Sequence, residues 1–261
     1  MPLRLYQVDA FTPKLFRGNP AGVCPLETWL PDELMQKIAM ENNLAETAFF
    51  VRTGERFRIR WFTPAVEVDL CGHATLASAF VIFNKEHFSG EKIEFDSRSG
   101  RLCVRREGDL LTLDFPADAY QPVAPPVGLV EALGAEPAEL HRGKTDYLAV
   151  YGTQAEIEAL SPDFGKLGKI EARGIIATAP GNDVDFVSRF FAPQVGIDED
   201  PVTGSAHTTL TPYWASRLGK AEMSAMQLSK RRGWLRVRLN GDRVEISGQA
   251  SVYLEGRIEI A

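Results

Sequence analysis

Hydrophobic and polar residues alternate along much of the first half of the chain, with the two-residue period of half-buried β-strands. This pattern predicts strands at Leu3–Ala10, Phe49–Arg52, Arg56–Phe62, Lys92–Phe95, Arg101–Arg105 and Leu110–Phe115. In the second half, similar patterns predict strands near Leu148–Tyr151, Gly174–Ala179 and Val184–Phe190. Strands are therefore expected along the whole length of the chain.

Helical patterns interrupt these strands. One predicted helix begins at Pro31-Asp32-Glu33, where proline and two acids suit a helix N-terminus, and ends at Asn42-Asn43. Another begins near Gly72-His73 and is apolar on nearly every side, so we expect it to fill a core. Two more are predicted, one near Gly128–Leu133 and one after Gly204. The second half thus repeats the mixture of strands and helices found in the first.

A proline-rich segment, PADAYQPVAPP, occupies Pro116–Pro126. Proline discourages both helices and central strands, so this segment is the best candidate for a linker. We therefore expect an N-terminal domain at residues 1–117 and a C-terminal domain at residues 118–261. The last strand could also return to the N-terminal domain.

Two segments of ten residues resemble each other: RWFTPAVEVD at Arg60–Asp69 and RFFAPQVGID at Arg189–Asp198. In each, an apolar strand is followed by a proline turn, an acid and then a glycine that opens a helix, Gly72 or Gly204. The match predicts an internal duplication with two comparable helix N-termini. Such termini expose unpaired N–H groups and partial positive charge. If both faced one crevice, they would suit a carboxylate or an enolate-like anion.

Composition narrows the class of protein. The net charge of −6 over 261 residues argues against a nucleic-acid partner, which usually requires a basic surface. The three cysteines lie far apart without a CxxC motif, so neither a disulfide framework nor a zinc site is expected. The sequence has no signal-peptide pattern and no apolar run approaching ~18 residues. We therefore expect a soluble, cytoplasmic protein that binds no membrane.

Four segments resemble, in order, the signatures of the PhzF-like isomerases of phenazine biosynthesis: GNPAGV, ENNLAETAFF, FTPAVEVDLCGHAT and DEDPVTGSAH. Together they span most of both halves. The resemblance implies a diaminopimelate-epimerase-like α+β fold, with two pseudo-symmetric domains, each a mixed β-sheet curled around a central helix. It also implies an isomerase that needs no metal or organic cofactor, acts on a small carboxylated metabolite between its domains and forms a homodimer.

The resemblance assigns roles to individual residues. Glu46 matches the acid/base of the family, His73 its active-site histidine and Asp200 its aspartate. Residues expected to bind substrate are Gly72, Gly204, Ser205 and Asn19, the last of which is otherwise explained as a turn former. Because burial raises the pKa of a carboxyl group, we expect a raised pKa for Glu46, which would suit proton transfer near neutrality.

Other readings of the same residues stay open. Without the resemblance, Glu46 could be a surface carboxylate at the edge of a strand. An epimerase or racemase would need two opposed groups, such as Glu46 with Asp200 or with Cys71. A racemase with two thiols is not expected, because the position opposite Cys71 holds Asp200 or Val202, depending on the alignment. The chain could also be a catalytically idle relative that binds a ligand.

Overall fold

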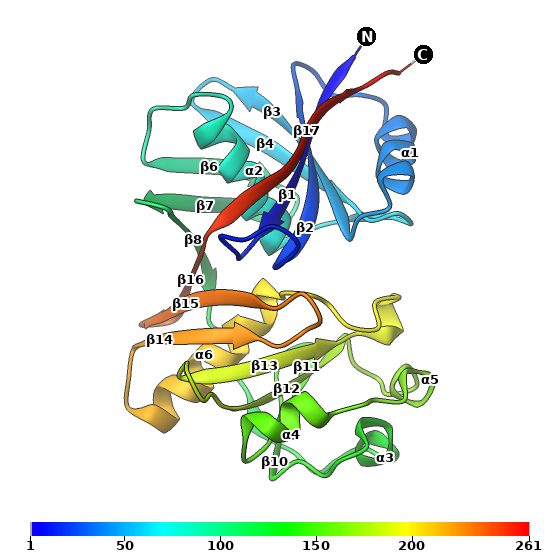
Figure 1. The fold of residues 1–261 in the computed structure, drawn as a ribbon, viewed down its shortest axis with the longest axis vertical. Coiled ribbons are helices and arrows are strands. Elements are labelled where there is room, and N and C mark those ends of the chain that lie inside the picture. The colour runs from blue at the N-terminus through cyan, green and yellow to red at the C-terminus, as the bar shows by residue number, and fades with distance from the viewer. Residues whose placement is uncertain (1, 261) are drawn as a thin grey trace. The chain divides into compact units, whose positions relative to one another are not determined.

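The computed structural model describes residues 2–260 and divides them into two compact units (Figure 1). Unit 1 runs to Asp114 and resumes at Ser247, and unit 2 is Phe115–Ile246. The chain passes from one unit to the other within two strands, β8 (Leu110–Pro116) and β16 (Arg243–Gly248). None of the helices in residues 2–260 is long and apolar enough to cross a membrane.

Unit 1 contains two helices, α1 (Asp32–Asn42) and α2 (Gly72–Asn84). Its strands besides β8 are β1 (Leu3–Ala10), β2 (Asn19–Leu26), β3 (Glu46–Thr53), β4 (Arg56–Phe62), β5 (Glu67–Val68), β6 (Lys92–Ser97), β7 (Gly100–Glu107) and β17 (Ala250–Ile258). The last of these, β17, pairs antiparallel with β1.

Unit 2 contains the helices α3 (Leu129–Leu133), α4 (Gln154–Ala159), α5 (Phe164–Leu167) and α6 (Gly204–Leu218), and a 3-10 turn at Pro193–Val195. Its strands besides β16 are β9 (Gln121–Pro122), β10 (Glu139–Arg142), β11 (Asp146–Val150), β12 (Gly174–Pro180), β13 (Phe186–Phe191), β14 (Glu222–Gln227) and β15 (Gly233–Asn240).

The hydrophobic pattern predicted most of these elements correctly. β1 and β4 have the bounds that alternation predicts, and α1 lies between the proline and asparagine expected to limit it. The proline-rich segment at Pro116–Pro126 is only partly a linker, because Pro116 ends β8 and β9 lies within the segment. Asn19 is not in a turn: it is the first residue of β2.

α2 is the central helix of unit 1. It packs against β1, β2, β3 and β17, which lie around it (Figure 1). Its apolar composition explains this position, because nearly every side chain of the helix is buried. The prediction that this helix fills a core is therefore confirmed.

α6 is the corresponding helix of unit 2 and packs against β11, β14 and β15. Its Trp214 stacks on Phe186 of β13, with ring centroids 5.7 Å apart, and the indole N–H donates to Thr178 Oγ1 of β12 over 3.0 Å. Both polar and apolar parts of the tryptophan are thus satisfied inside the unit. These contacts hold the helix against its sheet.

Neighbouring strands follow the same order of directions in the two units. In unit 1, β1–β2 is antiparallel, β2–β3 parallel, β3–β4 antiparallel, β4–β6 parallel and β6–β7 antiparallel. In unit 2, the same series runs through β10, β11, β12, β13, β14 and β15. The central helix follows the fourth strand of each series, so the topology supports the predicted internal duplication.

The arginine that opens each repeated segment makes two contacts that correspond in the two units. Arg60 forms two hydrogen bonds of 2.7 Å to the Glu67 carboxylate, and Arg189 forms bonds of 2.7 and 3.0 Å to Glu199. Each guanidinium also lies over the phenylalanine two residues further on. Bidentate pairs of this kind hold the loop before the helix against the strand.

These contacts correct the ungapped alignment. Glu67 and Glu199 each precede the first glycine of their helix by five residues, although they follow their arginines at different distances. The second copy therefore carries an insertion of three residues before the acid. Counted back from the helices, the counterpart of Cys71 is Thr203, neither Asp200 nor Val202, and the counterpart of His73 is Ser205.

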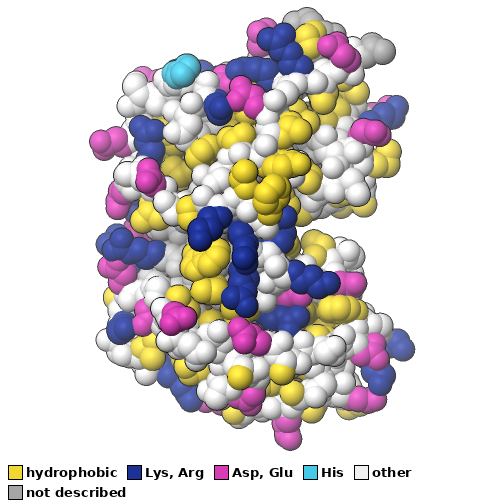
Figure 2. Space-filling model, in the orientation of Figure 1, with side chains coloured by type: hydrophobic (Ala, Val, Ile, Leu, Met, Phe, Trp, Pro, Cys, Tyr) yellow, Lys and Arg dark blue, Asp and Glu magenta, His cyan; other side chains and the backbone are white. Residues whose placement is uncertain are grey.

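Figure 2 shows hydrophobic side chains on the surface of unit 1 in the region of β17. Large exposed hydrophobic residues here include Tyr253 and Leu254 of β17, with Phe16 from the loop after β1. The rings of Phe16 and Tyr253 contact each other edge to face at 5.6 Å.

Candidate active site

Glu46 and His73 lie against each other in unit 1. Glu46 is the first residue of β3 and His73 is the second residue of α2. Glu46 Oε2 lies 3.1 Å from His73 Nε2, and the two side chains are only 12% and 7% exposed. The strand start and the helix start thus bring together two of the three residues that the resemblance assigned to catalysis.

Asn19 and Cys71 contact the other side of the imidazole. Asn19 Nδ2 lies 3.2 Å from His73 Nδ1, and Cys71 Sγ lies 3.5 Å from the same nitrogen. Both residues are buried, Asn19 at the start of β2 and Cys71 at the N-cap of α2. Polar neighbours therefore contact both nitrogens of His73, which restricts the orientation of the ring.

The expected raised pKa of Glu46 is wrong. Burial alone would raise the pKa of this carboxyl, but the charge of His73 at 3.1 Å lowers it more, so the pKa lies below its usual value. Burial likewise opposes a charge on His73, but Cys71 and Glu46 hold its pKa well above the usual value. The prediction considered only the apolar surroundings of Glu46, and the histidine that outweighs them comes from a distant part of the chain. Near neutral pH, the site contains a carboxylate beside an imidazolium.

Cys71 stays a thiol under the same conditions. Burial, followed by the charge of Glu46, raises the pKa of Cys71 to about 11, although His73 acts in the opposite direction. Since the thiolate is the reactive form of cysteine, Cys71 is poorly suited to act as a base.

One group of three in residues 2–260 could hold a metal ion: ligand atoms of Glu46, Cys71 and His73 lie within 4.8 Å of one another. A metal ion there would have to displace the proton of a thiol whose pKa is about 11 and break the contact between Glu46 and His73. The donor set therefore suits proton transfer better than metal binding. The expectation that the reaction needs no metal or cofactor stays a prediction.

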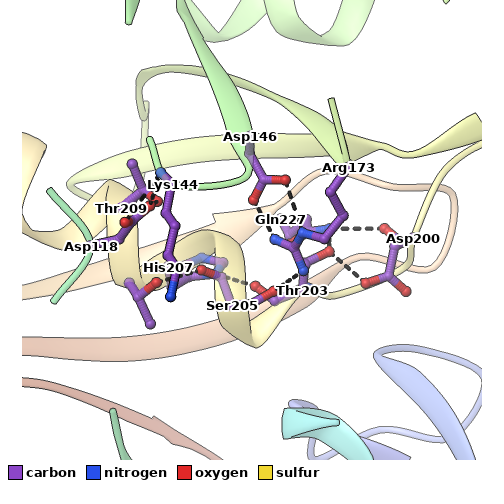
Figure 3. Close-up of polar contacts among 11 residues, drawn as sticks. Asp118, Lys144, Asp146, Arg173, Asp200, Thr203, Ser205, His207, Thr209 and Gln227 are labelled. Atoms are coloured by element: carbon purple, nitrogen blue, oxygen red, sulfur yellow. Dashed lines mark hydrogen bonds and ion pairs between the residues drawn. The ribbon is translucent and has the colours of Figure 1, made fainter. Parts of the chain in front are cut away.

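The start of α6 in unit 2 has a different chemistry, shown in Figure 3. Gly204 and Ser205 are the first two residues of this helix. Ser205 Oγ accepts a hydrogen bond of 2.8 Å from Arg173 Nη1. The same guanidinium donates through Nε and Nη2 to the two carboxylate oxygens of Asp146, which is buried.

Asp200 lies in the loop that enters α6. Its carboxylate accepts a hydrogen bond of 2.5 Å from the Thr203 hydroxyl, and its carbonyl accepts one of 2.8 Å from the buried Gln227 amide. Gln227 Oε1 in turn accepts from the Thr203 N–H over 2.8 Å. Asp200 is thus part of a hydrogen-bonded brace at the helix entrance (Figure 3).

The predicted site residues therefore fall into two groups. Asn19, Glu46, Gly72 and His73 lie together in unit 1, while Asp200, Gly204 and Ser205 lie together in unit 2. Arg173 and Asp146 were not predicted as site residues from the sequence. One signal was available, because an arginine directly precedes the apolar run GIIATA, as Glu46 opens the run TAFFV.

Comparisons with known proteins identify relatives over nearly the whole length of the chain. A family model described as phenazine biosynthesis-like protein, PhzC-PhzF, matches residues 8–256. A protein of Pseudomonas aeruginosa named an uncharacterized isomerase is 53% identical over 260 residues, which is 100% of both chains.

Solved structures also include a PhzF-family protein that resembles this chain over its full length. The crystal structure of a PhzF-family phenazine biosynthesis protein from Enterococcus faecalis matches with a TM-score of 0.97 at 44% identity, covering 100% of both chains. A hydroxyproline epimerase from Agrobacterium vitis matches with a TM-score of 0.61 at 10% identity, over 98% of this chain and 92% of the epimerase. At that identity, the likeness shows the fold alone, which is the expected epimerase-like α+β fold.

Proposed function

Because the chain belongs to the PhzC-PhzF family of phenazine biosynthesis-like proteins and is an isomerase, we propose that it moves a proton within a small carboxylated metabolite. In this proposal Glu46 alone serves as base and acid, without a cofactor. The observation that carries it is the buried contact of 3.1 Å between the Glu46 carboxylate and the His73 imidazole.

The charge state of this contact supports a role for Glu46 as the base. Its lowered pKa keeps the carboxylate ionised near neutral pH, so no proton has to be lost before the reaction. Glu46 takes a proton from a substrate carbon and becomes a neutral acid, and the electron pair of the broken C–H bond moves into the adjacent unsaturated system. Glu46 then returns the same proton to another carbon on the same face.

His73 supports both steps electrostatically. Its imidazolium stabilises the ionised form of Glu46 before the reaction and the negative charge on the substrate after proton removal. The N-terminus of α2, where Gly72 and His73 lie, contributes partial positive charge in the same place. A fixed cation suits an anion that exists only between the two proton transfers.

We further propose that Ser205, with the backbone of Gly204, binds the substrate carboxylate and that Asp200 fixes its polar substituents. These roles, the expected binding cleft and the homodimer stay predictions.

The alternatives have less support. An epimerase that used Cys71 would need its thiolate, which the raised pKa disfavours, and Thr203 at the counterpart position offers no second thiol. An epimerase that used Glu46 and Asp200 would invert a stereocentre, and an idle relative would bind ligand without turnover. Product stereochemistry therefore distinguishes these alternatives from the proposed isomerisation.

The test is Glu46→Gln. A screen for metabolites that raise the melting temperature of the wild type would first supply a substrate, and turnover of both proteins would then be measured. General acid–base catalysis contributes roughly 10²–10⁴-fold, so Glu46→Gln should lose at least that much activity and still bind the metabolite. Glu55→Gln, a change at an exposed position, is the control and should keep wild-type turnover. Near-normal turnover by Glu46→Gln would refute the proposal.

A further inference from the structure

The strand register shows which residue of unit 2 occupies the place of Glu46. In unit 1, Thr47 lies opposite Phe62, and in unit 2, Ile175 lies opposite Phe191. Since the two phenylalanines correspond in the repeat, the counterpart of Glu46 is Gly174, the first residue of β12.

Position 174 has no room for a side chain larger than that of glycine. A Cβ at this position would lie 2.2 Å from the ring of Phe190 in the adjacent strand. The residue directly before it, Arg173, extends its side chain to Ser205, the counterpart of His73. Both units therefore bring an ionised side chain at a strand start against the second residue of the central helix.

Other contacts hold the Arg173 guanidinium in place. Asp146 accepts two of its hydrogen bonds, and the Asp146 side chain is only 3% exposed. The guanidinium carbon also lies 5.3 Å from the centre of the Phe190 ring. A planar guanidinium fixed on two sides has little freedom left, so the direction of its third contact, to Ser205, is set by the structure.

The hydrogen bond from Arg173 decides how Ser205 can act. Arginine only donates, so Ser205 Oγ must accept in this contact, and its hydroxyl hydrogen needs a different acceptor. Within the part of the chain that the structure describes, Ser205 Oγ has no other hydrogen-bond partner. The hydroxyl is therefore free to donate to a ligand. In contrast, a ligand that donates a hydrogen bond to Ser205 Oγ would compete with the Arg173 guanidinium, which already donates to this oxygen.

We propose that Arg173 is a positioning residue that, held by Asp146, fixes the Ser205 hydroxyl as a donor to a carboxylate of the substrate. The inference rests on the proposed function, in which Ser205 binds the substrate carboxylate. It adds that specificity for an anionic acceptor depends on a residue that need not touch the substrate.

The experiment uses benzoate, an aromatic carboxylate that cannot be isomerised. Binding to the full chain is followed by NMR at the backbone amides of Gly204 and Ser205 in four proteins: wild type, Arg173→Met, Ser205→Ala and the double variant. Each single change removes or misdirects a hydrogen bond to the carboxylate, so each should weaken benzoate binding about tenfold or more. Because Arg173 acts through Ser205, the double variant should bind no more weakly than Arg173→Met alone.

Two further variants control for folding. Arg217→Met removes an exposed arginine in the last turn of the same helix and should leave benzoate affinity unchanged. Arg173→Lys keeps the charge but cannot bond Asp146 and Ser205 with one planar fork. It should therefore bind benzoate with intermediate affinity, and it tests the proposal if Arg173→Met fails to fold.

The outcomes separate this inference from the proposed function. Unchanged benzoate affinity in Arg173→Met, or effects that multiply in the double variant, would overturn the positioning role, as would a wild type whose Ser205 amide does not respond to benzoate. Glu46→Gln should bind benzoate like the wild type while losing turnover. With a substrate, Arg173→Met should raise KM and leave kcat nearly unchanged, because it does not affect the proton transfer itself.

Discussion

At the start of α2, two ionisable side chains, Glu46 and His73, contact each other, whereas at the start of α6 the guanidinium of Arg173 donates a hydrogen bond to the hydroxyl of Ser205. The two helices hold corresponding places in their units. The Glu46–His73 contact and the Arg173–Ser205 contact join corresponding positions, except that Arg173 lies one residue before the counterpart of Glu46. The two contacts therefore differ mainly in the chemical groups that they bring together.

We infer from this difference that, after the duplication, unit 1 took on proton transfer and unit 2 took on carboxylate binding. A base that receives a proton needs a pKa that its surroundings can adjust, and in unit 1 burial and ion pairing act on Glu46 in opposite directions. In our proposal, the hydroxyl of Ser205 binds the substrate carboxylate, and the guanidinium of Arg173 fixes the direction of that hydroxyl. One scaffold can therefore serve both tasks, because the strand start and helix start set the geometry and the side chains set the charge.

The contrast between the two helix starts requires that the imidazolium of His73 sets the pKa of Glu46 in unit 1. In His73→Asn the imidazolium is lost, so burial should dominate and raise the pKa of Glu46, and turnover should fall by roughly 10²-fold or more. A pH–rate profile on an identified substrate would show both effects, with the acid limb moved to higher pH.

His87→Asn is a suitable control for this change. His87 is exposed, and its φ of 53° lies in the left-handed region that asparagine tolerates. It should keep the wild-type profile. An unchanged acid limb in His73→Asn would mean that His73 does not set the pKa of Glu46.

Each central helix also contains a buried histidine, and the two should titrate in opposite ways. Burial lowers the pKa of His207 in α6 to about 4, only partly offset by the hydrogen bond of 2.8 Å between its Nδ1 and the Thr203 carbonyl. His73 should instead remain charged above its usual pKa. NMR titration of the ring protons would test this, and a similar midpoint for both histidines would contradict it.

The two shifts act on stability at opposite ends of the pH range. Unfolded His207 gains its proton near pH 6.5, so its contribution is lost as the pH falls from 6.5 to about 4, by roughly 3 kcal/mol in total. The contribution of His73 is complete below pH 6.5 and is lost as the pH rises through its raised pKa. Urea unfolding at several pH values would measure both, and His207→Gln should flatten the acid part alone.

Much of this comparison could be predicted from the sequence. Alternation located β1 and β4, the apolar run after Gly72 located the core helix, and the repeat indicated the duplication. Such features are local, because the side chains that define a strand or helix are close together in the chain.

The rest depended on contacts between distant residues. The lowered pKa of Glu46 requires His73, and the role of Arg173 requires both Asp146 and Ser205. The counterpart of Cys71 was misplaced because an insertion in the loop before α6 leaves no hydrophobic pattern. A sequence pattern shows which residues share a face, but it does not show which partners will set their charge.

The smallest expected effect concerns Cys71, where the two units place a thiol and a hydroxyl at the same N-cap position. If the thiol only packs, Cys71→Ala should keep most turnover and cost about 1 kcal/mol of unfolding free energy. Cys71→Ser should behave similarly, because it gives the unit 1 position the hydroxyl that Thr203 supplies in unit 2. The Cys71 pKa of about 11 explains the expectation, since a thiol that stays protonated at neutral pH cannot remove a proton from the substrate. Turnover assays and urea unfolding of both variants would measure the two quantities. Loss of turnover with intact folding would instead show that the thiol takes part in the chemistry, and a one-base mechanism at Glu46 would then have to be abandoned.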